Sequence, residues 1–221
     1  MSHTPLDVAR SAMVAQQIRT CEVLDERLLE QLRKVPREDF VPEGYRAAAF
    51  ADAAIPIGRG QVMFPPMLDA RLVNALALRP EDRVLEVGTG TGYLTAVLSG
   101  LARLVYSVEI VPEFKLRAAA RLAAHAATNA LVEVGDAARG WPRHAPYDAI
   151  LVSGALPLGP DPRFREPLAP GGRLVVIVGE PPAMEAHLIV REDADRYSER
   201  SLFETDVPVL INAPQRERFF F

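Results

Sequence analysis

The chain has 221 residues, of which 49% are hydrophobic and 24% are charged, and its formal net charge is −4. These values are typical of one globular α/β domain with an added segment, and they exclude a globally disordered chain. The acidic balance argues against a general nucleic-acid binder, because such proteins usually carry a basic stripe.

The cysteine content and the distribution of apolar residues indicate where the protein works. Cys21 has no second cysteine with which to form an intrachain disulfide, which suits a reducing compartment. Residues 1–11 include Asp7 and Arg10 and lack a long apolar run, so no signal peptide is expected. No segment approaches the roughly 20 apolar residues of a membrane-spanning helix. We therefore expect a cytoplasmic protein without a membrane partner.

The first part of the chain, residues 1–79, is predicted to be helical and then irregular. Residues 12–18 and 25–34 fit helices. The second of these would carry one apolar stripe, formed by Leu24, Leu28, Leu29 and Leu32. Residues 42–66 are rich in proline, glycine and alanine, which predicts irregular structure, and 67–78 fit a further helix.

From residue 80 onward, short apolar runs alternate with helical stretches, as in a series of βα units. Strands are expected at 83–87, 104–109, 131–134, 148–152, 172–178, 184–191 and 198–207. Helices are expected at 93–101, 112–127 and 164–168. The alternation predicts a largely parallel sheet with helices on its faces.

The first of these strands runs into a glycine-rich turn, Glu86-Val87-Gly88-Thr89-Gly90-Thr91-Gly92-Tyr93. Glycines permit a sharp bend and close approach of a ligand, and the N-terminus of the following helix presents free N–H groups. A dinucleotide fingerprint would need glycine at position 93, which is tyrosine. Glu86 would repel a pyrophosphate but suits the ammonium group of a methionine moiety. The turn therefore favours S-adenosylmethionine over NAD, with a purely structural strand–helix turn as the alternative.

Two acidic residues at later strand ends fit the same cofactor. Glu109 lies 21 residues beyond Gly88, where Rossmann-like folds place a carboxylate that binds ribose hydroxyls. Asp136 ends the third strand and is placed to meet the adenine amino group, with capping of the next turn as its alternative role. The predicted cofactor-binding residues are Glu86, Gly88, Thr89, Gly90, Gly92, Tyr93, Glu109, Ile110, Gly135, Asp136 and Ala137. No histidine or cysteine spacing indicates a metal site.

Several segments distributed over residues 13–179 together resemble the protein-L-isoaspartate (D-aspartate) O-methyltransferase family. Before the glycine turn these are Val35-Pro36-Arg37-Glu38, Ile55-Pro56-Ile57-Gly58 and Gly60-Gln61. After it they are Gly140-Trp141-Pro142, Pro146-Tyr147-Asp148-Ala149-Ile150 and Pro170-Gly171-Gly172-Arg173-Leu174-Val175. The turn alone would indicate only a methyltransferase, whereas the ordered segments before it specify the family.

The resemblance implies a class I methyltransferase Rossmann-like fold of the α/β class, with a mostly parallel seven-stranded sheet flanked by helices and an N-terminal helical extension. Residues 80–221 would bind S-adenosylmethionine, and residues 1–79 would form part of the substrate site within one compact unit. The implied reaction transfers a methyl group to the α-carboxylate of an L-isoaspartyl residue in a protein or peptide, leaving S-adenosylhomocysteine. The ester then cyclises to a succinimide that can reopen to aspartate, which is protein repair. Because a carboxylate is already ionised at neutral pH, placement and water exclusion would supply catalysis.

The chain departs from the family after Gly60-Gln61, where the family usually has Thr-Ile-Ser. Val62-Met63-Phe64 stand there, so both hydroxyls are absent. The resemblance places Gln61 and Phe64 at the catalytic site, yet Phe64 cannot donate the hydrogen bond that the family's serine gives to the substrate carboxylate. Phe64 is expected to stack on a flat ligand or to seal the pocket. A packing replacement in a displaced loop is the alternative.

Three functions therefore stay open at this point. The first is an isoaspartyl carboxyl methyltransferase, the second a methyltransferase with a different acceptor, and the third a non-catalytic S-adenosylmethionine-binding protein. The last three residues, Phe219, Phe220 and Phe221, are expected to pack on the domain or on a partner, and a homodimer is one such arrangement.

Overall fold

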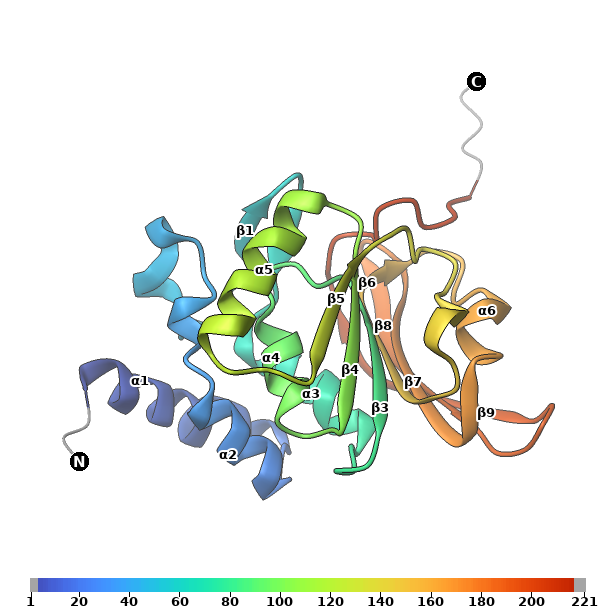
Figure 1. Ribbon diagram of the computed structural model, residues 1–221, viewed down its shortest axis with the longest axis horizontal. Helices are drawn as coiled ribbons and strands as arrows, with labels where there is room; N and C mark the ends of the chain where they lie inside the picture. The colour runs from blue at the N-terminus through green and yellow to red at the C-terminus, as the bar shows by residue number, and fades with distance from the viewer. Residues whose placement is uncertain (1–3, 217–221) are drawn as a thin grey trace.

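In the computed structural model, which describes residues 4–216, one seven-stranded sheet runs through the centre of the molecule (Figure 1). In spatial order its strands are β5 (Ala130–Val134), β4 (Leu104–Glu109), β3 (Arg83–Val87), β6 (Tyr147–Leu156), β7 (Leu168–Glu180), β8 (Ala183–Arg191) and β9 (Tyr197–Thr205). The strands from β5 to β7 are parallel, and β8 is antiparallel to both of its neighbours. The predicted mostly parallel Rossmann-like sheet is confirmed.

Helices cover the two faces of this sheet unequally (Figure 1). They are α1 (Pro5–Met13), α2 (Glu26–Lys34), α3 (Pro66–Leu76), α4 (Tyr93–Ser99), α5 (Pro112–Ala124) and α6 (Pro162–Arg165). Val84 of β3 belongs to a hydrophobic cluster with residues of α2, α3 and α4, whereas its neighbour Leu85 belongs to a second cluster with Phe164 of α6. Successive side chains of β3 thus enter opposite cores, as expected for a strand buried on both faces.

The N-terminal extension becomes helical earlier than residue 12, where the helix was predicted to begin. α1 starts at Pro5 because Thr4 and Asp7 form a reciprocal capping box at its N-terminus. The chain then continues as a π-helix over Val14–Ile18 and a 3-10 turn over Arg19–Cys21. Thr4 and Asp7 mark the start of the helix in the sequence, whereas the apolar periodicity alone did not indicate a helix before residue 12.

The start of α2 corrects one predicted core position. Asp25 is the N-cap of this helix, and its side chain accepts hydrogen bonds from the first turn. Leu24 precedes that cap and is 65% exposed, so its assignment to the apolar stripe was wrong. The other three leucines of the predicted stripe, Leu28, Leu29 and Leu32, are buried.

The segment predicted to be irregular contains a short antiparallel hairpin. It is formed by β1 (Ile55–Gly58) and β2 (Gln61–Met63), and the preceding 3-10 helix spans Glu43–Ala48. Arg59 and Gly60 form the turn with φ of 54° and 71°. Turns with positive φ at both positions match the twist of a hairpin, and glycine adopts them readily. The prediction of irregular structure was therefore wrong for residues 55–63.

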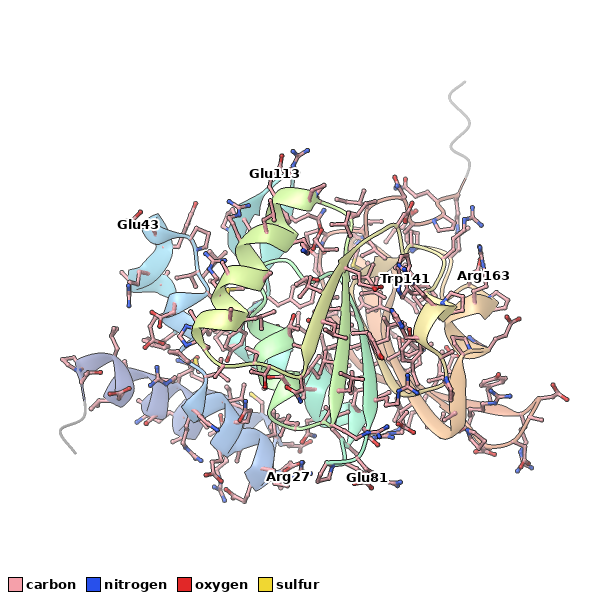
Figure 2. All side chains as sticks on the ribbon, in the orientation of Figure 1. Arg27, Glu43, Glu81, Glu113, Trp141 and Arg163 are labelled. Carbon is pink, nitrogen blue, oxygen red and sulfur yellow. The ribbon has the colours of Figure 1, made fainter. Side chains whose placement is uncertain are left out.

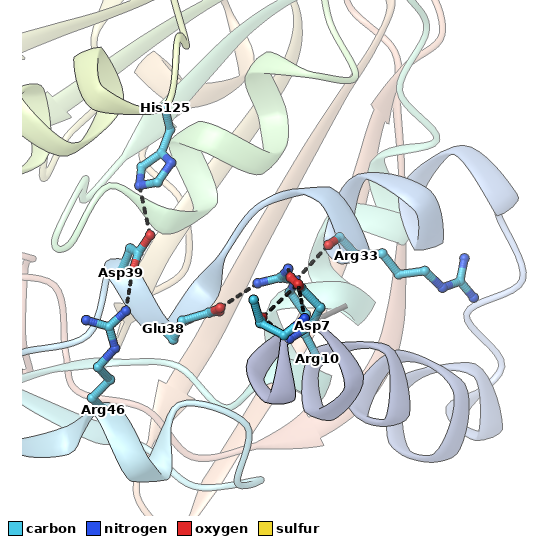
Figure 3. A network of polar contacts seen from close by, with 8 residues as sticks. Asp7, Arg10, Arg33, Glu38, Asp39, Arg46 and His125 are labelled. Atoms are coloured by element: carbon cyan, nitrogen blue, oxygen red, sulfur yellow. Dashed lines mark hydrogen bonds and ion pairs between the residues drawn. The ribbon is translucent and has the colours of Figure 1, made fainter. Parts of the chain in front are cut away.

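Charged side chains tie the extension to the rest of the molecule (Figure 3). Arg10 of α1 donates to Glu38 at 2.6 Å and to the carbonyl oxygen of Arg33 at 2.7 Å. Asp39 lies 3.4 Å from His125, which follows α5. These contacts join α1, the end of α2 and the 3-10 turn Arg37–Asp39 to the face covered by α5.

Arg27 connects α2 to the loops that follow α3 and α4. Its guanidinium donates to the carbonyl oxygens of Leu78 at 3.1 Å and Leu101 at 3.0 Å. Figure 2 shows Arg27 near Glu81, at the end of the sheet where β3 begins, and Glu113 at the far end.

No helix within residues 4–216 is both long enough and apolar enough to cross a membrane. The predicted packing of Phe219, Phe220 and Phe221 falls outside the described residues.

Candidate functional site

A cavity lies at the carboxyl ends of the parallel strands, which is where open α/β sheets bind their ligands. β3 pairs with β4 on one side and with β6 on the other, so the strand order reverses there. Nine of the predicted cofactor-binding residues line the cavity: Gly88, Thr89, Gly90, Tyr93, Glu109, Ile110, Gly135, Asp136 and Ala137. The predicted catalytic residues Gln61 and Phe64 line it as well.

The crevice between β3 and β6 depends on Gly88, whose φ is 96°. A Cβ at this position would lie 3.3 Å from the carbonyl oxygen of Ser153 and 3.5 Å from its Cβ. Glycine therefore allows the two strand ends to approach closely. Ser153 lines the cavity, and its buried hydroxyl has no hydrogen-bond partner among residues 4–216. A polar atom of a bound ligand would satisfy it.

Glu109 is held at the end of β4 by two backbone donors. One carboxylate oxygen accepts from the Gly90 N–H at 2.8 Å, and the other accepts from the Val111 N–H at 2.9 Å. Each oxygen of an ionised carboxylate has a further lone pair, so the side chain can still accept from two ligand hydroxyls. This donor and acceptor geometry suits a ribose diol.

Asp136 is held in the same way at the end of β5. One oxygen accepts from the Ala138 N–H at 3.0 Å, which is the turn-capping contact considered from the sequence, and the other accepts from the Asn212 amide at 2.9 Å. The side chain also lines the cavity, so capping and ligand binding are compatible. Asn212 fixes the neighbouring wall residues Leu210 and Ile211 beside the strand ends.

Gly135 provides room for an aromatic ring behind this wall. A Cβ on Gly135 would lie 2.3 Å from the ring of Trp141, a position that real Cβ atoms do not occupy. Trp141, labelled in Figure 2, donates its indole N–H to Glu133 at 3.2 Å. The glycine is therefore needed for packing as well as for the cavity surface.

Glu86 lies beneath the glycine turn rather than on the cavity surface. It is fully buried and accepts hydrogen bonds from Thr95 at 2.5 Å and Ser107 at 2.6 Å. Ser107 also contacts Thr89, which lines the cavity, at 2.6 Å. Burial raises the pKa of Glu86 to about 8, and the hydroxyl hydrogen bonds only partly offset this rise. In this position Glu86 braces the turn through its hydroxyl neighbours.

Gly92 is likewise absent from the cavity lining and has a packing role. Its φ is 86°, and a Cβ would lie 3.1 Å from the Cβ of Ala118. The residue therefore allows the start of α4 to approach the middle of α5 closely.

Asp69 lines the cavity and belongs to a buried ion pair with Arg37, a pairing that was not predicted from the sequence. Arg37 donates to Asp69 at 2.6 Å and to the carbonyl oxygen of Ala49 at 2.9 Å, and a third contact reaches the carbonyl oxygen of Phe64. Arg37 is fully buried and Asp69 is 2% exposed. Burial raises the pKa of Asp69 to about 7, against the opposing effect of the Arg37 charge.

Tyr93 lies next to this ion pair, with the Arg37 guanidinium 4.6 Å from the centre of its ring. The side chain is 2% exposed, and its hydroxyl has no hydrogen-bond partner among the described residues. Burial raises the pKa of Tyr93 to about 12, so the hydroxyl keeps its proton at neutral pH and can donate it to a ligand.

The sequence held one signal for the ion pair. Asp69 is spaced three, four and seven residues before Leu72, Val73 and Leu76, so it shares the buried face of α3. An acidic residue on an apolar helix face requires a buried partner. Ser153 carried no comparable signal, because a serine at a strand end is common.

A family model described as protein-L-isoaspartate(D-aspartate) O-methyltransferase matches residues 8–209 of this chain. A relative from Polaromonas sp. (strain JS666), protein-L-isoaspartate O-methyltransferase 1, is 38% identical over 93% of this chain and 86% of its own length. The corresponding enzyme of Roseiflexus sp. (strain RS-1) is 46% identical over 76% of each chain.

Two solved structures show the same fold. One, a protein-L-isoaspartate O-methyltransferase, matches with a TM-score of 0.79 and 24% identity. The match covers 90% of this chain and 65% of the solved chain. The other is a Plasmodium falciparum protein described as a putative member of this enzyme class, in complex with S-adenosyl-L-homocysteine. It matches with a TM-score of 0.77 and 17% identity over 91% of this chain and 97% of its own.

Proposed function

Because the chain belongs to the protein-L-isoaspartate(D-aspartate) O-methyltransferase family, we propose that it transfers a methyl group from S-adenosylmethionine to the carboxylate of L-isoaspartyl residues in damaged proteins. The observation that carries this proposal is that the matched residues, 8–209, include both the hairpin and the strand ends that line one cavity. The product is a methyl ester that can cyclise and reopen as part of protein repair.

The cavity fits an adenosyl cofactor by the chemistry of its walls. The Glu109 carboxylate would accept from the ribose hydroxyls, and Asp136 would accept from the adenine amino group. The glycines at 88 and 90 leave the backbone open to the methionine part of the cofactor. When bound, S-adenosylmethionine supplies an electrophilic methyl group on sulfur.

The acceptor carboxylate needs no general base, so the chain's task is to position it and to exclude water. The β1–β2 hairpin and the start of α3 are the part of residues 1–79 that would contribute to the acceptor site. Gln61 and the hydroxyls of Tyr93 and Ser153 are the polar groups offered there, while Phe64 would shield the reacting atoms from solvent. Phe64 is 5% exposed, which supports the shielding role.

Methyl transfer from labelled S-adenosylmethionine should be measured with an isoaspartyl peptide and with its aspartyl twin. We expect transfer to the isoaspartyl peptide alone. Binding of S-adenosylhomocysteine, measured by calorimetry on the same sample, shows that the protein is folded. Binding without transfer to either peptide would contradict the proposed activity.

A different methyl acceptor is the second candidate, and Val62 and Phe64 favour it because they remove hydroxyls from the acceptor side. It predicts cofactor binding and transfer to small carboxylic acids in place of peptides. The main proposal also includes a cytoplasmic location, which the single cysteine supports. It includes action on protein rather than nucleic acid, which the net charge of −4 supports.

A further inference from the structure

A second cavity of about 490 Å³ adjoins the first one, and its size is within the usual range for ligand sites. Val62 and Phe64 line both cavities, so these two side chains form the partition between them. The far side of the second cavity is formed by Arg71 of α3 and by residues 203–209 at the end of β9. We call this second cavity the acceptor groove.

Three exposed carboxylates line the acceptor groove: Asp52, Glu204 and Asp206. None of the three has a side-chain hydrogen bond or an ion pair with any residue in 4–216. By contrast, Glu199, which lies on the same strand as Glu204, forms ion pairs with both Arg165 and His187. The groove therefore collects negative charges that the chain itself does not neutralise.

One positive charge faces these carboxylates. The guanidinium of Arg71 lies over the Phe203 ring, 3.6 Å from its centre, and both residues line the groove. Three carboxylates and one guanidinium leave two negative charges. This net negative charge repels a substrate that carries a carboxylate. A lysine or arginine next to that carboxylate would be attracted by the groove and would offset the repulsion.

We propose that the acceptor groove binds the peptide segment next to the methyl-accepting residue and selects segments that carry lysine or arginine there. The inference rests on the proposed function and adds a charge preference to it. The segment is placed by the position of the groove, which is separated from the cofactor cavity only by Val62 and Phe64, and the unpaired carboxylates supply the selectivity. Because these charges are exposed, the preference is expected to be several-fold and to weaken with salt.

The test uses two isoaspartyl peptides that are identical except for lysine or glutamate on both sides of the isoaspartyl residue. For the unaltered protein at low ionic strength, we expect kcat/KM to be about five- to tenfold higher for the lysine peptide, mainly through KM. At roughly 0.5 M salt the ratio should approach one, since charge interactions at exposed sites are then screened. Anisotropy of labelled peptides in the presence of S-adenosylhomocysteine gives the same comparison without turnover.

The deciding variants are a groove triple, Asp52→Asn, Glu204→Gln and Asp206→Asn, and a control triple, Glu30→Gln, Glu81→Gln and Asp195→Asn. The control residues are exposed carboxylates outside the groove, and the net charge changes equally in both triples. We expect the groove triple to lose the preference and the control triple to keep it. Equal methylation and binding of both peptides by the unaltered protein, or the same preference in both triples, would overturn the inference while leaving the proposed function intact. If neither peptide is methylated or bound, the proposed function fails, and the inference fails with it.

Discussion

Glu109 connects the glycine turn to the proposed ribose site, so its charge can be tested directly. In Glu109→Gln, one of the two backbone N–H donors at Gly90 and Val111 would face an amide NH₂ group. Since hydrogen bonds to charged groups contribute about 1.5–3 kcal/mol, we expect the Kd for S-adenosylhomocysteine to rise about 10- to 100-fold. Calorimetric titration measures this change. Glu113→Gln is the control, because that carboxylate is exposed and, among residues 4–216, pairs with exposed Arg59 alone; equal losses in both variants would argue against the ribose assignment.

Glu86 makes folding stability depend on pH. Its pKa is about 8 in the folded state, against an ordinary value of 4.5. Between these values the folded state holds a proton that the unfolded state has lost. The contribution is therefore fully present below about pH 4.5 and is lost as the pH rises toward 8, with a slope of up to about 1.4 kcal/mol per pH unit.

The variant Glu86→Gln cannot titrate, which isolates this contribution from that of Asp69. We expect the unfolding free energy of the unaltered protein to fall more steeply than that of the variant between pH 5.5 and 8. Urea unfolding at several pH values provides the measurement. Parallel curves for the two proteins would show that Glu86 is ionised throughout this range in the folded state.

At the scale of elements, the contact between α4 and α5 depends on Gly92. Gly92→Ala places a Cβ at a left-handed φ of 86° and 3.1 Å from Ala118. Backbone strain and overpacking together should lower the unfolding free energy by about 2–4 kcal/mol. Gly44→Ala is the matched control, because no atom lies within 4 Å of its added Cβ. Equal denaturation midpoints for the two variants would contradict this account of the packing.

The elements that the sequence predicted best are those with local signals at both ends. β4 occupies the predicted residues because an apolar run ends at Glu109 and is followed by Pro112. β6 extends to Leu156, beyond the predicted residue 152, because its later residues pair with β7 and with Val209. Such non-local pairing leaves no local pattern, and the same limitation hid the β1–β2 hairpin.

For the candidate site, the residues at the strand ends could be predicted from the sequence, but the residues that hold them in place could not. Gly88, Glu109 and Asp136 follow strands and could be placed by order and spacing alone. Asn212, which holds Asp136, and the Arg37–Asp69 pair, which places Asp69 on the cavity wall, come from distant parts of the chain. Glu86 shows the converse limit, because its spacing fits a ligand contact while one of its carboxylate oxygens accepts from Thr95 and Ser107 beneath the turn and the other has no hydrogen-bond partner among the described residues.

For the whole molecule, the Arg37–Asp69 pair joins the extension to the cavity wall in a fully buried setting. Arg37→Met leaves the Asp69 carboxylate without its partner, and we expect a loss of about 3–5 kcal/mol in unfolding free energy. The double variant Arg37→Met with Asp69→Leu removes both charges and should be less destabilised than the single variant. Arg59→Met, which breaks an exposed pair, should change stability by about 1 kcal/mol or less. A double variant that is as unstable as the sum of its single variants would show that the two charges do not interact.

The residues that line the cofactor cavity extend from Ile57 to Ile211, which has a consequence for synthesis in the cell. A ribosome extends a chain at about 5–20 residues per second, and a domain generally folds as a unit. The strand ends that carry Gly88 and Glu109 emerge well before Ile211 closes the last wall. A nascent chain therefore lacks a complete cofactor site until its last wall residues emerge, so methyl transfer competence arises only after residue 211 has left the exit tunnel.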